Sequence, residues 1–323
     1  MAYHPNGKNY IYSLGASVVV GDLADVHSQK FLRKHDDEIT CLEVSPSGKY
    51  IASGQKGNES NVYIWDFESG KAIYGFEEFD QSVVSVGFSM DERMLVTLGG
   101  EEPGRQMYIY DLSNGMIVAT VSKLPAGTVT AVFGGFIKDI KRRDTERYTL
   151  CSGGTSGLTL WDLDPYSGDI DAVSLKGDAR ATVKRSYTAV AYSIDGETIL
   201  GASESGDLQI VSAKAERIVS SVACCRKGLL TLRTFAGGVV VGGGDCSLKL
   251  LNMNMDVVAE TALDGAVLSL SLSPDGLEAL AATSTGSVFR VNLVTMQHIL
   301  FSESHSAAVT AVAFPSNNSD IFA

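Results

Sequence analysis

Residues 39–76 read ITCLEVSPSGKYIASGQKGNESNVYIWDFESGKAIYGF, and this stretch decides the fold. It contains four short runs rich in apolar residues, and the first run alternates apolar and polar side chains as a half-buried strand does. Between the first two runs, Pro46 presets the backbone for a turn and Gly48 closes it. The stretch therefore predicts a four-stranded antiparallel unit, with strands at Ile39–Val44, Tyr50–Ser53, Val62–Asp66 and Ala72–Phe76.

The same order of runs recurs along most of the chain. In three copies the third run ends on an aromatic residue followed by Asp, at Trp65-Asp66, Tyr110-Asp111 and Trp161-Asp162. The copies begin roughly 38–58 residues apart, which brackets the ~40–45 residues of a WD repeat. The first strands of the five later copies are expected at Val83–Phe88, Val129–Phe133, Tyr187–Tyr192, Leu229–Thr234 and Val267–Leu272.

Both ends of the chain carry strands that belong to no complete copy. Tyr10–Leu14, Val18–Leu23 and Gln29–Leu32 are typical of second, third and fourth strands without a first strand, whereas Val309–Phe314 is typical of a first strand alone. Sharing one blade between the two ends closes a ring and removes exposed sheet edges. We therefore predict an all-β fold, a seven-bladed WD40-type β-propeller whose seventh blade is closed by the N-terminal strands plus a C-terminal strand.

The domain organisation follows from this closure. We expect residues 1–319 to form a single WD40 β-propeller. The last four residues, Asp320–Ala323, follow a turn and look like another second strand, which repeats the role of Tyr10–Leu14. We interpret residues 320–323 as the start of a truncated second propeller.

The composition excludes several classes of protein. The chain has 323 residues, 45% of them hydrophobic, and a formal net charge of −12, so it repels nucleic acid and anionic membranes on average. The N-terminus lacks the basic and apolar regions of a signal peptide, and no apolar run approaches the ~18 residues of a membrane span. Five cysteines without a CxxC motif fit a reducing compartment. We expect an intracellular chain that binds neither nucleic acid nor membranes.

One group of polar residues matches the internal hydrogen-bonded set of a WD repeat. His35 precedes the first complete copy at the place of the repeat's Gly-His, and such a His usually meets a Ser or Thr and the Trp inside the blade. Buried polar groups require such partners, so we expect His35, Ser53 and Trp65 to form one set. The interpretation is structural, with blades held together and no catalysis, for His35, Ser53, Trp65, Asp66, Trp161 and Asp162.

Patterns that carry chemistry are absent. The five histidines form no HExxH or HxH motif, and none lies next to a cysteine at zinc spacing. The glycine-rich segments 152–157 and 242–245 lie between strands, whereas a phosphate-binding loop leads into a helix. We expect no catalytic residue, no metal, no cofactor and no small-molecule substrate.

The third copy carries the most distinctive surface segment. Residues 137–147 replace the short turn between its first two strands, and they are basic on an acidic protein. Two interpretations stay open, a solvated loop or a contact with an acidic partner. The candidate partner-binding residues are Lys138, Lys141, Arg142, Arg143 and Arg147.

Three segments carry a resemblance to a known family: His4-Pro5 with Tyr10–Gly15, then Ser47–Gln55, then Leu95–Gly100. They resemble the first propeller of the cilia- and flagella-associated protein fifty-two family, WD-repeat proteins of ciliary doublet microtubules. The Ile-Ala-Ser-Gly-Gln run within the second segment is more distantly similar to the echinoderm microtubule-associated protein-like family. The resemblance covers most of the chain and is clearest in its first half. It implies two propellers in tandem, attachment to tubulin and no catalytic residues.

These observations lead to one function and one alternative. The chain is expected to be a non-catalytic scaffold that binds tubulin, microtubules or axonemal proteins in cilia and flagella, at the axoneme or basal body. The alternative is a general intracellular adaptor that binds peptides on a propeller face. As a fragment, the chain is expected to be monomeric.

Overall fold

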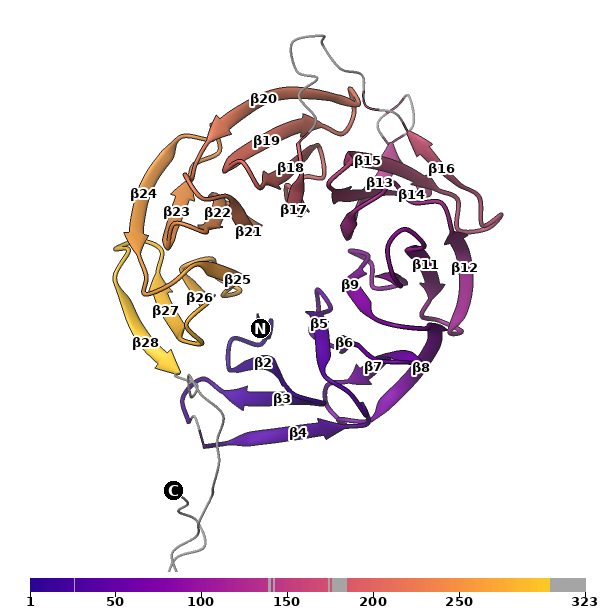
Figure 1. Ribbon diagram of the computed structural model, residues 1–323, viewed down its shortest axis with the longest axis horizontal. Coiled ribbons are helices and arrows are strands. Elements are labelled where there is room, and N and C mark those ends of the chain that lie inside the picture. The colour runs from indigo at the N-terminus through magenta and orange to yellow at the C-terminus, as the bar shows by residue number, and fades with distance from the viewer. Residues whose placement is uncertain (26, 139–140, 142, 174, 176–184, 303–323) are drawn as a thin grey trace, which may run out of the picture.

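The computed structural model describes every residue except 26, 139–140, 142, 174, 176–184 and 303–323. In this part of the chain, every regular element is a β-strand. The strands form seven antiparallel sheets of four strands each, which stand around a central axis like the blades of a propeller (Figure 1). The predicted seven-bladed all-β propeller is confirmed.

Six blades are continuous in sequence, and each runs from an inner strand at the axis to an outer strand at the rim. Blade one consists of β5 (Ile39–Val44), β6 (Tyr50–Gln55), β7 (Ser60–Asp66) and β8 (Ala72–Phe79). Blade two consists of β9 (Val83–Phe88), β10 (Met94–Gly99), β11 (Gln106–Asp111) and β12 (Met116–Val121). Blade three consists of β13 (Thr128–Lys138), β14 (Asp144–Gly154), β15 (Gly157–Leu163) and β16 (Ile170–Val173). Blade four consists of β17 (Tyr187–Tyr192), β18 (Thr198–Ser203), β19 (Asp207–Ser212) and β20 (Arg217–Ala223). Blade five consists of β21 (Leu229–Phe235), β22 (Gly238–Gly243), β23 (Ser247–Leu251) and β24 (Val257–Ala262). Blade six consists of β25 (Val267–Leu272), β26 (Glu278–Thr283), β27 (Val288–Asn292) and β28 (His298–Ser302).

The turn between β5 and β6 forms as its sequence predicts. The Ser45 N–H donates to the Tyr50 carbonyl at 2.9 Å, and the Gly48 N–H donates to the Ser45 carbonyl at 2.8 Å. Gly48 has a φ of 83°, which favours glycine, and a Cβ there would lie 2.6 Å from the His4 ring. The turn therefore requires glycine for both conformation and space.

All six continuous blades share one irregularity near the axis. The register between the inner and second strands shifts at the start of each inner strand, as in a β-bulge. In blade one the extra residue is Thr40, whose hydroxyl donates to the Val83 carbonyl of blade two at 2.5 Å. In blade four Thr188 donates to the Leu229 carbonyl of blade five at 2.5 Å. In these two blades the bulge places a threonine hydroxyl where it connects one blade to the next, whereas the extra residue is apolar in the other four, at Val84, Val129, Leu230 and Leu268.

The hydrophobic core lies between the sheets. Ile64 and Phe76 of blade one pack against Leu95 and Tyr110 of blade two, and the Phe76 and Tyr110 rings stack at 3.9 Å between centroids. Equivalent clusters fill the spaces between the following blades. Burial of apolar surface between blades is therefore the main stabilising force, at roughly 25 cal/mol per Å².

The seventh blade departs from one prediction. It consists of β1 (Ala2–Tyr3), β2 (Asn9–Leu14), β3 (Ser17–Asp22) and β4 (Gln29–Arg33), so the expectation that the N-terminus lacks an inner strand is wrong. A turn at Asn6-Gly7 folds the chain back, and Tyr3 pairs with Tyr10. The Tyr3 N–H also donates to Ser271 Oγ of blade six at 2.8 Å. A two-residue strand shows no alternation, so the sequence pattern could not indicate it.

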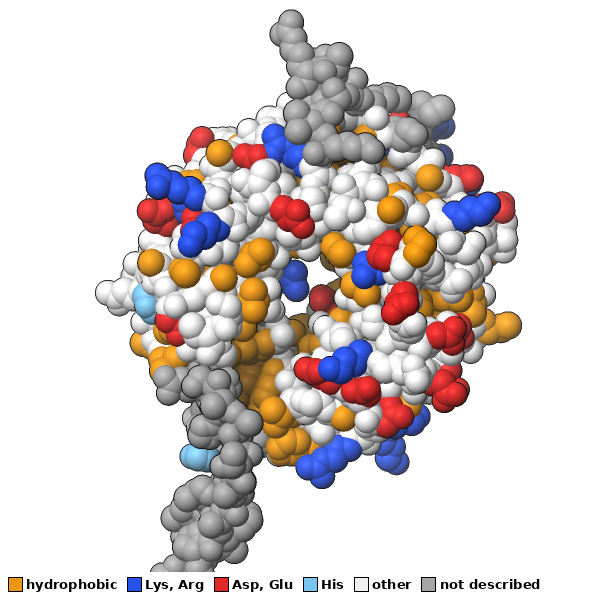
Figure 2. All heavy atoms as spheres, in the orientation of Figure 1, with side chains coloured by type: hydrophobic (Ala, Val, Ile, Leu, Met, Phe, Trp, Pro, Cys, Tyr) orange, Lys and Arg blue, Asp and Glu red, His pale blue; other side chains and the backbone are white. Residues whose placement is uncertain are grey.

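The predicted C-terminal strand, Val309–Phe314, and residues 320–323 lie outside the described residues. Within the described part, β1 covers only the first half of the inner edge of β2, and no strand pairs there with Tyr12–Leu14. Figure 2 shows an apolar hollow between the sheets of blades six and seven, where Tyr10 and Leu280 belong to one cluster. The edge and the hollow leave room for the predicted strand, and closure by Val309–Phe314 stays a prediction.

Candidate protein-interaction surface

The polar set predicted in blade one is brought together inside the sheet. The Trp65 indole N–H donates to Ser53 Oγ at 2.8 Å, and Ser53 Oγ lies 2.7 Å from His35 Nε2. His35 Nδ1 lies 2.6 Å from Gln55 Oε1, and the Gln55 amide donates to Asp36 at 2.5 Å. Burial lowers the pKa of His35, so the ring is neutral and its Nδ1–H donates to Gln55.

These contacts form a directed chain that starts at the Trp65 indole, which only donates, and ends at the Asp36 carboxylate, which only accepts; Ser53, His35 and Gln55 between them both donate and accept. Because Ser53 is fully buried, its hydroxyl cannot reach a substrate, and the chain of hydrogen bonds supports the blade. Sequence reasoning missed Gln55 and Asp36. The Ser-Gly-Gln run of Ser53–Gln55 was the signal that could have indicated them. Gln55 is fully buried, and a buried Gln needs hydrogen-bond partners for both its carbonyl and its NH2 group.

The other predicted structural residues have separate roles. In blade three the Trp161 indole N–H donates to Ser152 Oγ at 2.9 Å, a shorter version of the blade-one set. Asp66 accepts from the Ser69 N–H at 2.8 Å and orders the turn that leads to the outer strand. Asp162 instead accepts from Arg147 Nε at 2.8 Å. The six residues are therefore not one site, and only the first three act together.

The basic segment of blade three forms a hairpin. Strands β13 and β14 each have 11 residues and stay paired as far as Lys138 and Asp144. At its base the Thr145 hydroxyl donates to the Ile137 carbonyl at 2.6 Å, and Phe136 packs against Tyr148 at 4.9 Å between ring centroids. The sequence predicted a loop here, whereas hydrogen bonds and apolar contacts order its base.

The basic side chains of this hairpin are not equivalent. Lys138, Lys141 and Arg143 are exposed, whereas Arg142 lies outside the described residues. Arg147 lies at the base, where its guanidinium lies 2.8 Å from Asp162 and 3.6 Å from Asp164. Arg147 therefore supports the hairpin, and the exposed cations are those nearer the tip.

The central opening holds an ion pair from two inner strands of different blades. Arg233 of β21 lies 3.9 Å from Glu43 of β5, and Figure 2 shows acidic and basic side chains inside the opening. The amino group of Met1 lies beside them, and burial together with Arg233 lowers its pKa.

Among the described side chains, no group of three or more His, Cys, Asp or Glu residues could hold a metal ion. The described ranges also contain no helix of the length and apolarity needed to cross a membrane.

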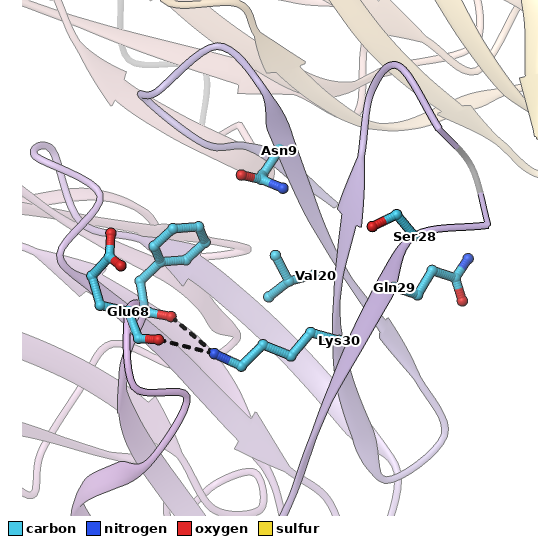
Figure 3. Close-up of a pocket in the computed structure, with 7 residues that line it drawn as sticks. Asn9, Val20, Ser28, Gln29, Lys30 and Glu68 are labelled. Carbon is cyan, nitrogen blue, oxygen red and sulfur yellow. Dashed lines mark hydrogen bonds between the residues drawn. The ribbon is translucent and has the colours of Figure 1, made fainter.

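A shallow pocket of about 260 Å³ lies between blades seven and one (Figure 3). Its one lysine, Lys30, donates to the carbonyls of Phe67 at 3.5 Å and Glu68 at 3.1 Å. This volume is below the ~300–1,000 Å³ of typical ligand sites. The Lys30 ammonium also already has hydrogen-bond partners within the protein, the two carbonyls. The pocket is therefore a joint between blades, lined by Asn9, Val20, Ser28, Gln29, Lys30, Phe67 and Glu68.

Comparisons with known proteins agree with this geometry. The family described as "WD domain, G-beta repeat" matches residues 27–66, which include His35, Ser53 and Trp65. Along 99% of its length, the chain is 28% identical to cilia- and flagella-associated protein 52 of Chlamydomonas reinhardtii and 23% identical to that of Homo sapiens. The chain resembles cilia- and flagella-associated protein 52. The predicted resemblance is thereby confirmed, and the chain spans 51% of the length of these relatives.

Two more distant similarities concern the WD repeat and the fold. WD repeat-containing protein 90 of Mus musculus is 24% identical over 97% of this chain, which spans 18% of that protein. The crystal structure of the Myceliophteria thermophila Cps50 (Swd1) β-propeller domain superposes with a TM-score of 0.66 and 17% identity, covering 81% of this chain and 85% of that one. The second similarity shows the propeller fold alone.

Proposed function

We propose that this chain is a non-catalytic WD-repeat scaffold of cilia and flagella that binds microtubules, through tubulin or through axonemal proteins. The observation that carries the proposal is the reach of its similarity to cilia- and flagella-associated protein 52, which extends over 99% of the chain and so beyond the single repeat at residues 27–66. The buried polar set of blade one supports the non-catalytic part of the proposal, because its hydroxyl and imidazole hydrogen-bond inside the sheet.

Electrostatics limit how such binding can work. The chain has a net charge of −12, and tubulin is also acidic, so their overall charges repel each other. Electrostatic attraction therefore has to come from a local cationic surface. The hairpin of blade three supplies one, with Lys138, Lys141 and Arg143 exposed beyond an ordered base.

Co-sedimentation with microtubules tests this proposal. We expect the chain to pellet with microtubules, and we expect replacement of Lys141, Arg142 and Arg143 by Glu to reduce the bound fraction strongly. A matched control replaces three exposed cations of the loops on the opposite face, Lys123, Arg226 and Lys227, by Glu. Equal binding of both variants would remove the hairpin from the proposal, and no pelleting at all would contradict direct microtubule binding.

A general adaptor that binds peptides on a propeller face is the second candidate. The observation that favours it is the ion pair of Arg233 and Glu43 inside the central opening, which could contact a charged peptide. A substitution of Arg233 that abolishes partner binding, with the hairpin variant unaffected, would support the adaptor.

A further inference from the structure

Two exposed apolar side chains lie at equivalent turns on either side of the basic hairpin. In blades one and six the second position of the turn between the inner and second strands is proline, Pro46 and Pro274. In blades two and four the same position holds Met90 and Ile194, whose side chains are 65% and 63% exposed. These two blades flank blade three.

Contacts place both turns against the base of the hairpin. On one side the Tyr148 hydroxyl of β14 donates to Asp91, the residue after Met90, at 2.6 Å. On the other side a Cβ built at Gly196, in the turn of Ile194, would lie 3.6 Å from the Gly135 amide of β13. Met90, the hairpin and Ile194 therefore follow one another on the same face of the ring.

The carboxylates in these turns are held by their own turns. Asp91 accepts from the Ser89 hydroxyl at 2.6 Å, and Asp195 accepts from the Ser193 hydroxyl at 2.5 Å and the Glu197 N–H at 3.0 Å. Hydrogen bonds from Ser193 and Glu197, with the charge of Lys138, lower the pKa of Asp195. Hydrogen bonds inside the two turns therefore hold these carboxylates, and Lys138 lies near enough to Asp195 to stabilise its charge.

We propose that Met90, Ile194 and the exposed cations Lys138, Lys141 and Arg143 form one docking strip for a partner segment that carries both acidic and apolar side chains. The proposal rests on the proposed function and states the chemistry of the partner. Exposed ion pairs alone bind weakly and are screened by salt, whereas burial of two apolar side chains adds affinity that salt does not remove. The strip thus explains how an acidic protein could hold an acidic partner at physiological ionic strength.

Peptide binding measured by fluorescence anisotropy tests the strip. The probes are three labelled synthetic peptides of equal length, built from Glu and Leu, from Glu and Ser, and from Lys and Leu. We expect the Glu/Leu peptide to bind most tightly. We expect the double variant M90S/I194S to weaken it by about tenfold, because two buried apolar contacts are lost. Replacing Lys138 and Lys141 by Gln should weaken both Glu peptides and reduce their salt dependence.

The matched control is P46S/P274S, which changes the same turn position in blades that do not flank the hairpin. Unchanged affinity of the Glu/Leu peptide for M90S/I194S, with unaltered thermal stability, would overturn the apolar part of the proposal. Equal affinity for all three peptides would overturn the strip as a whole. Microtubule co-sedimentation separates this outcome from the proposed function, because wild-type chain that still pellets keeps the scaffold proposal while the strip fails.

Discussion

Replacing Ser53 by Ala tests the hydrogen-bonded set of blade one. The Ser53 hydroxyl is the shared partner of the Trp65 indole at 2.8 Å and of His35 Nε2 at 2.7 Å, and all three side chains are buried. Alanine leaves both groups without a partner, and each orphaned buried group costs about 1–3 kcal/mol. We therefore expect the free energy of unfolding to fall by about 2–6 kcal/mol, a large part of the ~5–15 kcal/mol of a typical domain.

The matched variant is Ser152→Ala in blade three, where one group alone, the Trp161 indole, loses its partner. We expect this change to cost about half as much, at about 1–3 kcal/mol. Urea unfolding followed by circular dichroism measures both variants without depending on tryptophan emission, which the substitutions themselves alter. A loss for Ser53→Ala that is no larger than that for Ser152→Ala would refute the reasoning.

Three further predictions concern pH, charge and backbone. Burial holds His35 neutral in the folded chain, whereas an imidazole in the unfolded chain gains a proton near about pH 6.5. The free energy of unfolding should therefore fall as the pH drops below that value. Urea titrations at several pH values measure this dependence, and His35→Asn should flatten it. Arg147→Ala should lower the melting temperature slightly at low salt and less at high salt, because its ion pairs with Asp162 and Asp164 are partly exposed. The control Lys141→Ala should leave the melting temperature unchanged. Gly48→Ala should destabilise the fold by more than the ~1–2 kcal/mol of a positive φ alone, because its Cβ would meet the His4 ring. The control is Gly7→Ala, where φ is 68° and nothing lies within 4 Å of the added Cβ. Calorimetry should show only the conformational cost for this control.

Much of the ring could be predicted from local patterns. Alternation along Ile39–Val44, the turn at Pro46-Gly48 and their recurrence specify inner strands and turns, because a half-buried strand and a tight turn each restrict residue type locally. The two-residue strand β1 could not be predicted, since its place depends on a turn at Asn6-Gly7 and on contacts with blade six.

The candidate site was predicted in part for the same reason. The spacing of His35, Ser53 and Trp65 follows the WD repeat, but the extension of the set to Gln55 and Asp36 depends on how the loop before β5 folds over the sheet. A run of basic residues does not show which of them are paired. Arg147 is placed beside Asp162 by the register of β14 and β15.

The location of the tagged chain in ciliated cells tests the central claim most directly. The account predicts a signal along the ciliary axoneme that remains after detergent extraction of the membrane. It also predicts that this signal weakens in the variant with Glu at positions 141–143. A diffuse signal that detergent removes completely, from a chain that is folded and intact, would contradict the account.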